Sequence, residues 1–317
     1  MYRDFAEKCL ALPVVAGEKP ENERFPGAVA TYSIEAMMQD GKALQAGTSH
    51  FLGTNFASAQ NIRFQNAEGQ LELANTTSWG VSTRMIGGVI MVHGDDDGLR
   101  VPPRIAPWQV VIVPMLRDQP EDEAIVAYCR ELQAELAKLS ALGEPVRALL
   151  DQRHGKAANK RWSWVKKGAP VIIEVGGRDV AGGNVSVIRR DRLYREDGKV
   201  DSAIGPRDAF LGEAAGLLEA IQAALHGQAT ERLRDGIEPV ADWAGMEARF
   251  AEATRNPGWA EVAWSRPSGD DLDAVVERLK AFKLTIRNAP MGQGRPEGSC
   301  VFTGRPAVER VLIGRAY

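Results

Sequence analysis

The sequence predicts an α+β and α/β protein in three parts, and three features of its pattern support this prediction. Short strand-like segments joined by turn residues fill residues 1–104. Strand and helix patterns alternate over 105–205, and long helices precede short strands over 206–317. Hairpin runs predict an antiparallel sheet, whereas strand–helix alternation predicts a parallel or mixed sheet. We therefore expect three domains with these boundaries.

The composition is ordinary for a globular chain with a sizeable core: 317 residues, 44% hydrophobic, 26% charged, net charge -3. The acidic balance argues against a protein that coats nucleic acid over its whole surface, but one basic face is compatible with it. The sequence has no bilayer-spanning apolar run and no signal-peptide core. Cys9, Cys129 and Cys300 lie too far apart in sequence to form a ligand pair. We therefore expect a reducing, cytoplasmic location.

Residues 1–104 show the spacing of one helix followed by hairpins. Apolar residues at helical spacing predict a helix over 2–12, which Pro13 ends. Asp40-Gly41 is a hairpin dipeptide between two β-prone segments. The expected strands are 28–36, 42–47, 61–65 and 70–74.

Residues 78–92 organise this first part. A β-prone lead-in reaches Gly80, and Ser82, Thr83 and Arg84 precede an apolar run. We expect a strand, a break, and a helix with Arg84 near its start. An arginine beside free backbone N–H groups suits a phosphate or a stacked base. The alternative is a buried helix capped by Ser82 or Thr83. The sequence has neither a Gly-x-Gly-x-x-Gly nor a Walker loop.

The elements of the other two parts are predicted from the periodicity of their apolar residues and from the residues that break helices and strands. Pro102-Pro103 marks a boundary, because two prolines stiffen the chain and stop a helix. In the second part we expect strands at 109–114, 145–150, 170–175 and 184–190, and helices at 121–142 and 157–167. In the third part we expect helices at 210–233, 243–253 and 271–281, and strands at 259–264, 282–286 and 308–313.

Three groups of polar residues are candidates for chemistry, each with a structural alternative. Residues 45–50 end a strand with glycine, threonine, serine and histidine, which suits a small polar substrate or a strand-end turn. Residues 95–98, Asp-Asp-Asp-Gly, suit magnesium or a solvated turn. Glu35 lines a pocket or balances a lysine, and the sequence does not distinguish these.

The segment from 153 to 190 is the most basic part of the chain. It holds nine arginines and lysines against two acidic residues, with Trp162 and Trp164 among them. Basic groups beside flat rings suit looped or single-stranded RNA. A solvated lysine face with tryptophans in the core is an equal alternative.

Residues 45–50, 78–84 and 92–99 together resemble prolyl-tRNA synthetase, in its archaeal/eukaryotic-like class II form. The likeness continues through residues 102–107 and reaches the terminal Tyr317, so it covers essentially the whole chain. It implies part of a class II catalytic domain over 1–104, an anticodon-binding domain over 105–205, and a C-terminal domain over 206–317.

The resemblance implies a proline–tRNA ligase, which activates L-proline with ATP and Mg²⁺ and esterifies the proline tRNA. Arg84 matches the catalytic, ATP-binding arginine of motif 3. The implied ATP-binding residues are Gln45, Thr48, Ser82, Thr83 and Arg84, of which Gln45 also meets the magnesium. The implied proline-binding residues are His50, Trp79 and Gly80. The implied tRNA-binding residues are Arg153, Lys160, Lys167, Arg178 and Arg190.

Departures from the family pattern limit these expectations. Motifs 1 and 2 are absent, so the chain resembles a C-terminal portion that is incomplete and inactive alone. Only Cys300 stands at a family zinc position, with Thr303 where a partner is expected, so we expect no zinc. Ser163 and Val165 replace acidic residues of the anticodon domain. The complete enzyme is expected to be a cytoplasmic homodimer with no membrane or DNA partner. The alternative is a non-catalytic RNA-binding paralogue.

Overall fold

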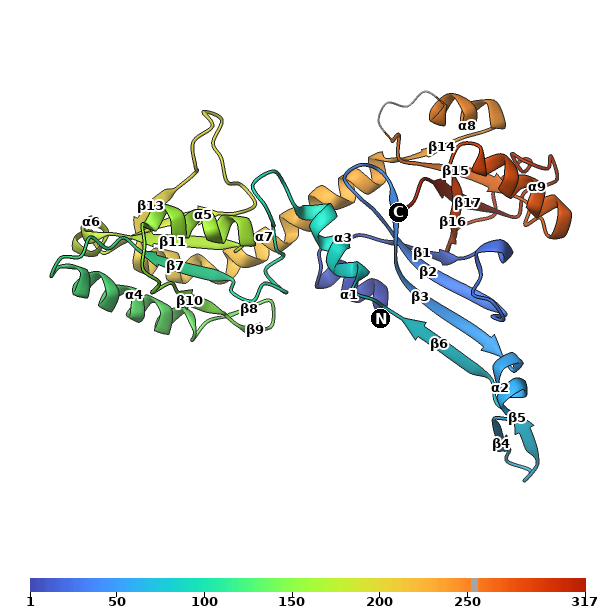
Figure 1. Ribbon diagram of the computed structural model, residues 1–317, viewed down its shortest axis with the longest axis horizontal. Helices are drawn as coiled ribbons and strands as arrows, with labels where there is room; N and C mark the ends of the chain where they lie inside the picture. Colours follow the sequence, from blue (N-terminus) through green and yellow to red (C-terminus); the bar gives the residue numbers. More distant parts are fainter. Residues whose placement is uncertain (252–255) are drawn as a thin grey trace. The chain divides into compact units, whose positions relative to one another are not determined.

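A computed structural model describes residues 1–251 and 256–317 (Figure 1). It divides the chain into two compact units. Unit 1 comprises residues 1–7, 12–92 and 230–317, and unit 2 comprises residues 8–11 and 93–229. No helix among the described residues is long and apolar enough to cross a membrane.

Unit 1 is built on one eight-stranded sheet with the order β14-β15-β17-β16-β1-β2-β3-β6. Every neighbouring pair in it is antiparallel except β14 and β15. Its strands are β1 (Val15–Glu18), β2 (Ala30–Met37), β3 (Ala43–Gly53), β6 (Thr76–Gly80), β14 (Ile237–Pro239), β15 (Trp259–Trp264), β16 (Thr285–Pro290) and β17 (Glu309–Gly314). The predicted antiparallel sheet is therefore confirmed.

The junction between β1 and β16 joins the two ends of the chain into this sheet. Gly17 lies opposite Pro290, and a side chain at Gly17 would meet the Ala289 carbonyl at 2.4 Å. Only glycine allows this close approach. The sequence pattern did not predict this pairing, because it joins residues more than 270 positions apart. The division of residues 1–104 and 206–317 into two separate domains, which the sequence predicts, stays a prediction.

Helices and a small hairpin complete unit 1. They are α1 (Tyr2–Lys8), η1 (Glu21–Glu23), α2 (Asn55–Gln60), β4 (Arg63–Gln65), β5 (Leu71–Leu73), α3 (Arg84–His93), α8 (Trp243–Phe250) and α9 (Gly269–Lys280). The hairpin of β4 and β5 extends beyond the ends of β3 and β6 (Figure 1). The last two residues of the helix predicted over 243–253 lie outside the described residues.

Unit 2 is a mixed sheet between helices, as the alternating pattern predicted. Its sheet has the order β10-β7-β11-β12-β13, parallel from β10 to β11 and antiparallel beyond. The elements are β7 (Val110–Pro114), α4 (Asp122–Leu136), β8 (Ser140–Ala141), β9 (Glu144–Pro145), β10 (Ala148–Leu150), α5 (Ala157–Lys167), β11 (Val171–Val175), α6 (Gly177–Gly182), β12 (Asn184–Arg189), β13 (Ala203–Pro206) and α7 (Arg207–Asp235).

Alternation along the buried strands explains the layers of unit 2. Ile112 and Ile173 pack with α4 and α7, whereas Val111 and Ile172 pack with Val165 of α5. Strands that are buried on both faces read as continuous apolar runs, which is why β7 and β11 were predictable. The helix predicted over 121–142 ends at Leu136, and the residues that follow form the β8–β9 hairpin, whose turn has positive φ at 142 and 143.

Candidate functional site

Strands β3 and β6 bring together the two polar segments that the sequence singled out. Thr48 lies opposite Gly80, and His50 lies opposite Ser78. Because side chains alternate across a strand, Thr48, His50 and the residues opposite them share one face of the sheet. Of the predicted ATP and proline positions on these two strands, Thr48, His50 and Gly80 therefore lie together on this face.

Arg84 begins α3 directly after β6 and reaches back to β3. Its backbone N–H donates to Ser82 Oγ at 3.2 Å, which is the cap that the sequence suggested. Its guanidinium donates to the Gln45 carbonyl at 3.4 Å, although the two residues are 39 positions apart. Arg84, Ser82 and Thr83 are exposed. The result is a solvent-facing cation and two hydroxyls at a helix N-terminus, an arrangement that suits an anion.

His50 is held in place by its surroundings on the same face. Its Nδ1 and Thr31 Oγ1 lie 3.0 Å apart, and the Phe25 ring lies 4.8 Å from the imidazole. Burial lowers the pKa of His50 below its ordinary value, so the neutral imidazole is favoured at pH 7. A neutral ring with one nitrogen engaged can offer its other nitrogen to a small polar ligand.

Glu35 lies opposite Gln45 and forms the centre of a buried charge cluster. Its carboxylate lies 3.0 Å from Lys19 Nζ and accepts from Arg287 Nη2 at 2.8 Å. All three side chains are at most 7% exposed. Burial lowers the pKa of Lys19, while the charge of Glu35 opposes that change. Glu35 therefore balances the charge of a lysine, which is one of the two alternatives that the sequence left open. It also balances the charge of an arginine.

Trp79 lies on the other face of the sheet from His50. Trp79 on β6 is opposite Ser49 on β3, and Ser49 is opposite Tyr32 on β2. The three residues therefore form one row across the sheet. This row borders a cavity of about 310 Å³, which Tyr2 and Met291 also line. Trp79 therefore does not share a sheet face with His50, with which the resemblance grouped it, although the predicted ATP residue Thr48 lines the same cavity.

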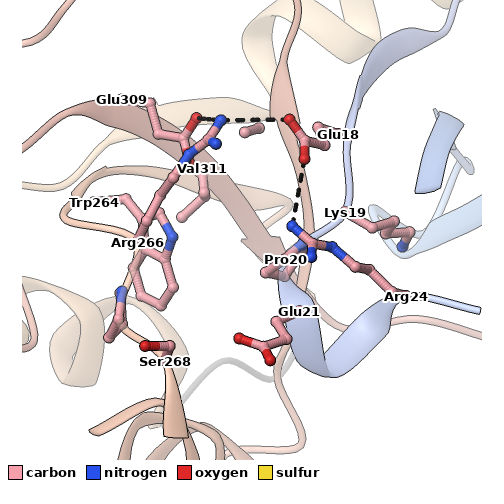
Figure 2. Close-up of a pocket in the computed structure, with 12 residues that line it drawn as sticks. Glu18, Lys19, Pro20, Glu21, Arg24, Trp264, Arg266, Ser268, Glu309 and Val311 are labelled. Atoms are coloured by element: carbon pink, nitrogen blue, oxygen red, sulfur yellow. Dashed lines mark hydrogen bonds and ion pairs between the residues drawn. The ribbon is translucent and has the colours of Figure 1, made fainter. Parts of the chain in front are cut away.

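A second cavity, of about 90 Å³, lies between β1 and the strands β15 and β17 (Figure 2). Glu18 accepts from Arg24 and Arg266, each at 3.4 Å, and Arg266 also donates to both oxygens of Glu309 at 2.7 Å. Two arginines and two glutamates thus neutralise one another. None of the site residues predicted from the sequence lines this cavity, so we assign these contacts a structural role.

The position of the family zinc site holds one thiol and two hydroxyls. Ser265 Oγ and Thr303 Oγ1 lie 2.9 Å apart, and Cys300 is buried beside them. Burial raises the pKa of the Cys300 thiol, but hydrogen bonds from Ser265 and Thr303 outweigh burial and lower it overall. Structural zinc takes four cysteine or histidine ligands, so this donor set does not fit zinc.

The turn at residues 95–98 is held by protein contacts. The Asp95 carboxylate accepts from both terminal nitrogens of Arg190, one at 2.7 Å, and from the backbone N–H of Asp97. Gly98 has φ +125°, and a side chain there would meet the Lys166 carbonyl at 2.6 Å. Within 1–251 and 256–317, no three His, Cys, Asp or Glu side chains are placed together to hold a metal ion.

Three of the predicted RNA contacts lie in reach of solvent on unit 2. Arg153 and Lys167 both approach the Trp164 ring, at 5.4 and 4.5 Å from its centre. Asp151 anchors this group by accepting from Arg153 and from the Trp164 indole N–H at 2.8 Å. Arg178 is exposed in the first turn of α6.

Lys160 and Arg190, the other two predicted RNA contacts, are buried. Lys160 is 5% exposed, and its Nζ lies 3.4 Å from the Asp151 carbonyl. Arg190 is 2% exposed and donates to the Val165 carbonyl as well as to Asp95. Both charges are therefore used inside the domain. Burial was the feature that the sequence did not reveal here.

Comparison with known proteins first indicates which class of domain residues 109–205 resemble. Residues 109–205, which cover most of unit 2 after Pro103, match the family model described as "Anticodon binding domain". An α/β domain that presents arginine, lysine and tryptophan side chains on its surface agrees with this class.

The whole chain, in turn, is similar to proline–tRNA ligases. It is 72% identical to the proline–tRNA ligase of Sphingomonas elodea, 65% to that of Sphingopyxis alaskensis and 43% to that of Bdellovibrio bacteriovorus. Each match covers 100% of this chain, but 60–62% of the relative. The chain therefore spans about three fifths of the length of the curated relatives it matches. The resemblance to prolyl-tRNA synthetase is confirmed, as is the mixed α+β fold class.

Proposed function

We propose that this chain provides the motif 3 side of a proline-activating site and the anticodon-binding domain of a proline–tRNA ligase. In the reaction, the proline carboxylate attacks the α-phosphate of ATP and pyrophosphate leaves. A hydroxyl at the 3′ end of proline tRNA then attacks the carbonyl carbon of the prolyl-adenylate, and AMP leaves. One observation supports this most strongly. The Arg84 guanidinium bonds the Gln45 carbonyl, and the β3–β6 register joins the ATP-binding and proline-binding segments.

The proposed roles follow from position and chemistry. Arg84, at the exposed start of α3, neutralises phosphate charge, and Gln45, Thr48, Ser82 and Thr83 add polar contacts to ATP. Aminoacyl-adenylate formation requires little covalent work from side chains, so positioning and charge neutralisation supply most of the catalysis. This assigns to Arg84 the catalytic role.

The residues present fit a magnesium ion that arrives with its nucleotide. Mg²⁺ prefers oxygen ligands and keeps several waters, taking few ligands from the protein. Gln45 can supply one amide oxygen, and substrate phosphates and water fill the other positions. When bound, the ion screens the phosphate charges.

For proline, we propose that neutral His50 is the polar anchor, next to the open space that Gly80 leaves. The resemblance also implies a role for Trp79, whose position on the other sheet face makes it the weakest member of this set. A small apolar substrate needs a tight pocket with few polar groups. We further propose a cytoplasmic location and a homodimer for the complete enzyme.

For proline tRNA, we propose Arg153, Lys167 and Arg178 as the direct contacts. They are within reach of solvent, and Trp164 lies beside two of them. The other two residues of the set, Lys160 and Arg190, act indirectly by holding the domain together.

The test is proline-dependent ATP–pyrophosphate exchange by two proteins. One is the 317-residue chain, and the other is a chimera in which this chain replaces the matching part of the Sphingomonas elodea relative. We expect exchange by the chimera, no exchange by the chain alone, and weak proline-tRNA binding by the chain. Robust exchange by the purified chain would show that it needs no further part. Exchange by neither protein, with tRNA binding intact, would favour the second candidate.

That second candidate is a non-catalytic RNA-binding protein related to prolyl-tRNA synthetase. The observation that favours it is that residues 109–205 match a family model described as an anticodon-binding domain. The retention of Gln45, Thr48, His50, Ser82 and Arg84 in one area of the sheet favours the ligase.

A further inference from the structure

Thr31 on β2 carries a buried hydroxyl directly beside the imidazole of His50. The two residues lie opposite each other in the β2–β3 register, and Thr31 is 1% exposed. The hydroxyl contacts two groups. Its Oγ1 accepts from the backbone N–H of Phe25 at 3.1 Å, and it lies 3.0 Å from His50 Nδ1. These two contacts decide which of the two side chains donates to the other.

The proton of the Thr31 hydroxyl has one acceptor within residues 1–251 and 256–317, and that acceptor is His50 Nδ1. A hydroxyl donates one hydrogen bond and accepts up to two. If Nδ1 carried a proton, Oγ1 would accept from both Phe25 and His50, and its own proton would be buried without a partner. Such a donor loses its hydration and gains nothing in return. The contacts are all satisfied only when Thr31 donates to an unprotonated Nδ1.

The single proton of the neutral imidazole then lies on Nε2. Burial lowers the pKa of His50, so that its ring is neutral at pH 7. The hydrogen bond at one ring nitrogen determines whether the other nitrogen is protonated. Nε2 has no hydrogen-bond partner in the described part of the chain, and His50 is only half-buried. His50 therefore presents a donor to a ligand on this face of the sheet.

The two polar groups of proline respond differently to such a donor. At neutral pH a secondary ammonium group only donates hydrogen bonds, whereas a carboxylate only accepts them. An Nε2–H group can therefore pair with an oxygen of the proline carboxylate but not with the ammonium group. The tautomer of His50 thus selects which end of the substrate this residue contacts.

We propose that Thr31 is a positioning residue that holds His50 as its Nε2–H tautomer, and that this Nε2–H group donates to the carboxylate of proline. The Phe25 backbone, which donates to the same hydroxyl, keeps that hydroxyl directed toward Nδ1. The carboxylate contact rests on the proposed function, in which His50 anchors proline. The tautomer is a property of the chain without ligand.

The first test measures the tautomer in the 317-residue chain without ligand, at pH 7.5. Two-bond ¹H–¹⁵N spectra of histidine-labelled protein show which ring nitrogen is protonated, and His50→Gln assigns the signal among the four histidines. We expect the Nε2–H form of His50 to exceed the Nδ1–H form at least tenfold. Thr31→Val, which removes the hydroxyl and keeps the shape, should lower this ratio at least threefold, and Thr31→Ser should restore it. The matched control, Thr77→Val, removes an exposed hydroxyl on β6 and should leave the ratio unchanged.

A predominant Nδ1–H form in the wild-type chain would overturn the proposal. So would a wild-type ratio in Thr31→Val that is folded by circular dichroism. If the valine variant does not fold, Thr31→Ala takes its place with the same expected loss.

The second test uses pyrophosphate exchange by the chimera to find which group of proline depends on Thr31. Cyclopentanecarboxylate keeps the ring and carboxylate of proline, whereas pyrrolidine keeps the ring and the ammonium group. We expect Thr31→Val to raise the KM for proline and the inhibition constant of cyclopentanecarboxylate at least fivefold. The KM for ATP and the inhibition constant of pyrrolidine should change less than twofold. An equal rise for both inhibitors, or a rise for pyrrolidine alone, would overturn the carboxylate contact. A chimera without any exchange would contradict the proposed function, whereas the tautomer is decided separately by the first test.

Discussion

The carboxylate of Asp151 is expected to stay ionised far below the ordinary range, because four donors hold it. The backbone N–H, Nε and Nη2 of Arg153 and the indole N–H of Trp164 all point at its oxygens. Burial alone would raise the pKa of Asp151, but these hydrogen bonds lower it to about 2, from an ordinary value of 3.8. The cluster that presents Arg153 and Trp164 thus depends on one charge.

The size of the effect follows from this pKa difference. It corresponds to about 2 kcal/mol, and solvent around the half-exposed Arg153 reduces it, so we expect Asp151→Asn to cost about 1–2 kcal/mol at pH 7. Because the pKa is lower in the folded state, the stabilisation is fully present above about pH 4. It is lost progressively as pH falls from about 4 to about 2. The asparagine variant should lack this acid sensitivity.

The assay is the ¹⁵N-labelled indole N–H resonance of Trp164, one of seven tryptophans, assigned with Trp164→Phe. A group with a pKa of about 2 is about one-tenth protonated at pH 3, so the resonance should move little between pH 6 and 3. An unperturbed carboxyl would be mostly protonated at pH 3. A titration midpoint near pH 4 in the wild-type chain would refute the reasoning.

Three further changes test the buried charges and one close backbone contact. Glu35→Gln leaves Lys19 and Arg287 buried without their anion, so it should lower the free energy of unfolding, measured in urea, by about 3–5 kcal/mol. Arg266→Gln changes a side chain that is 55% exposed and should lower it by less than about 1 kcal/mol. Equal losses for the two variants would contradict this ranking. Asp95→Asn removes the charge that Arg190 pairs with and should lower stability by at least about 2 kcal/mol, as measured by the urea midpoint of unit 2; an unchanged midpoint would contradict it. Gly98→Ala should cost about 1–3 kcal/mol by the same measurement, because glycine there has φ +125° and no room for a side chain.

Local patterns predicted most of the elements. The buried strands β7 and β11 were visible as apolar runs, and α5 was predicted with the bounds it has, Ala157–Lys167. The strand, break and helix around Gly80 were also predicted, with Arg84 at the start of α3. These features depend on neighbouring residues, so a single sequence contains them.

Long-range pairing and burial were not predictable in this way. Nothing local indicates that β1 pairs with β16, or that Arg287 completes the charge cluster around Glu35. Arg190 and Lys160 looked like surface cations, because charge alone does not reveal a buried partner. For Trp79, the face was decided by its register with Ser49, which only the assembled sheet provides. The family roles of the site residues came from resemblance and remain proposals.

The proposed site is tested most directly by separating its two activities in the chimera. We would measure proline-dependent pyrophosphate exchange and proline-tRNA binding for Arg84→Ala and for Arg178→Ala, an exposed arginine in the anticodon-binding domain. Because Arg84 is proposed to serve ATP, its variant should lose exchange and keep tRNA binding nearly intact, whereas Arg178→Ala should weaken tRNA binding and keep exchange. Exchange that survives Arg84→Ala, or an equal loss of both activities, would contradict the proposed role of Arg84.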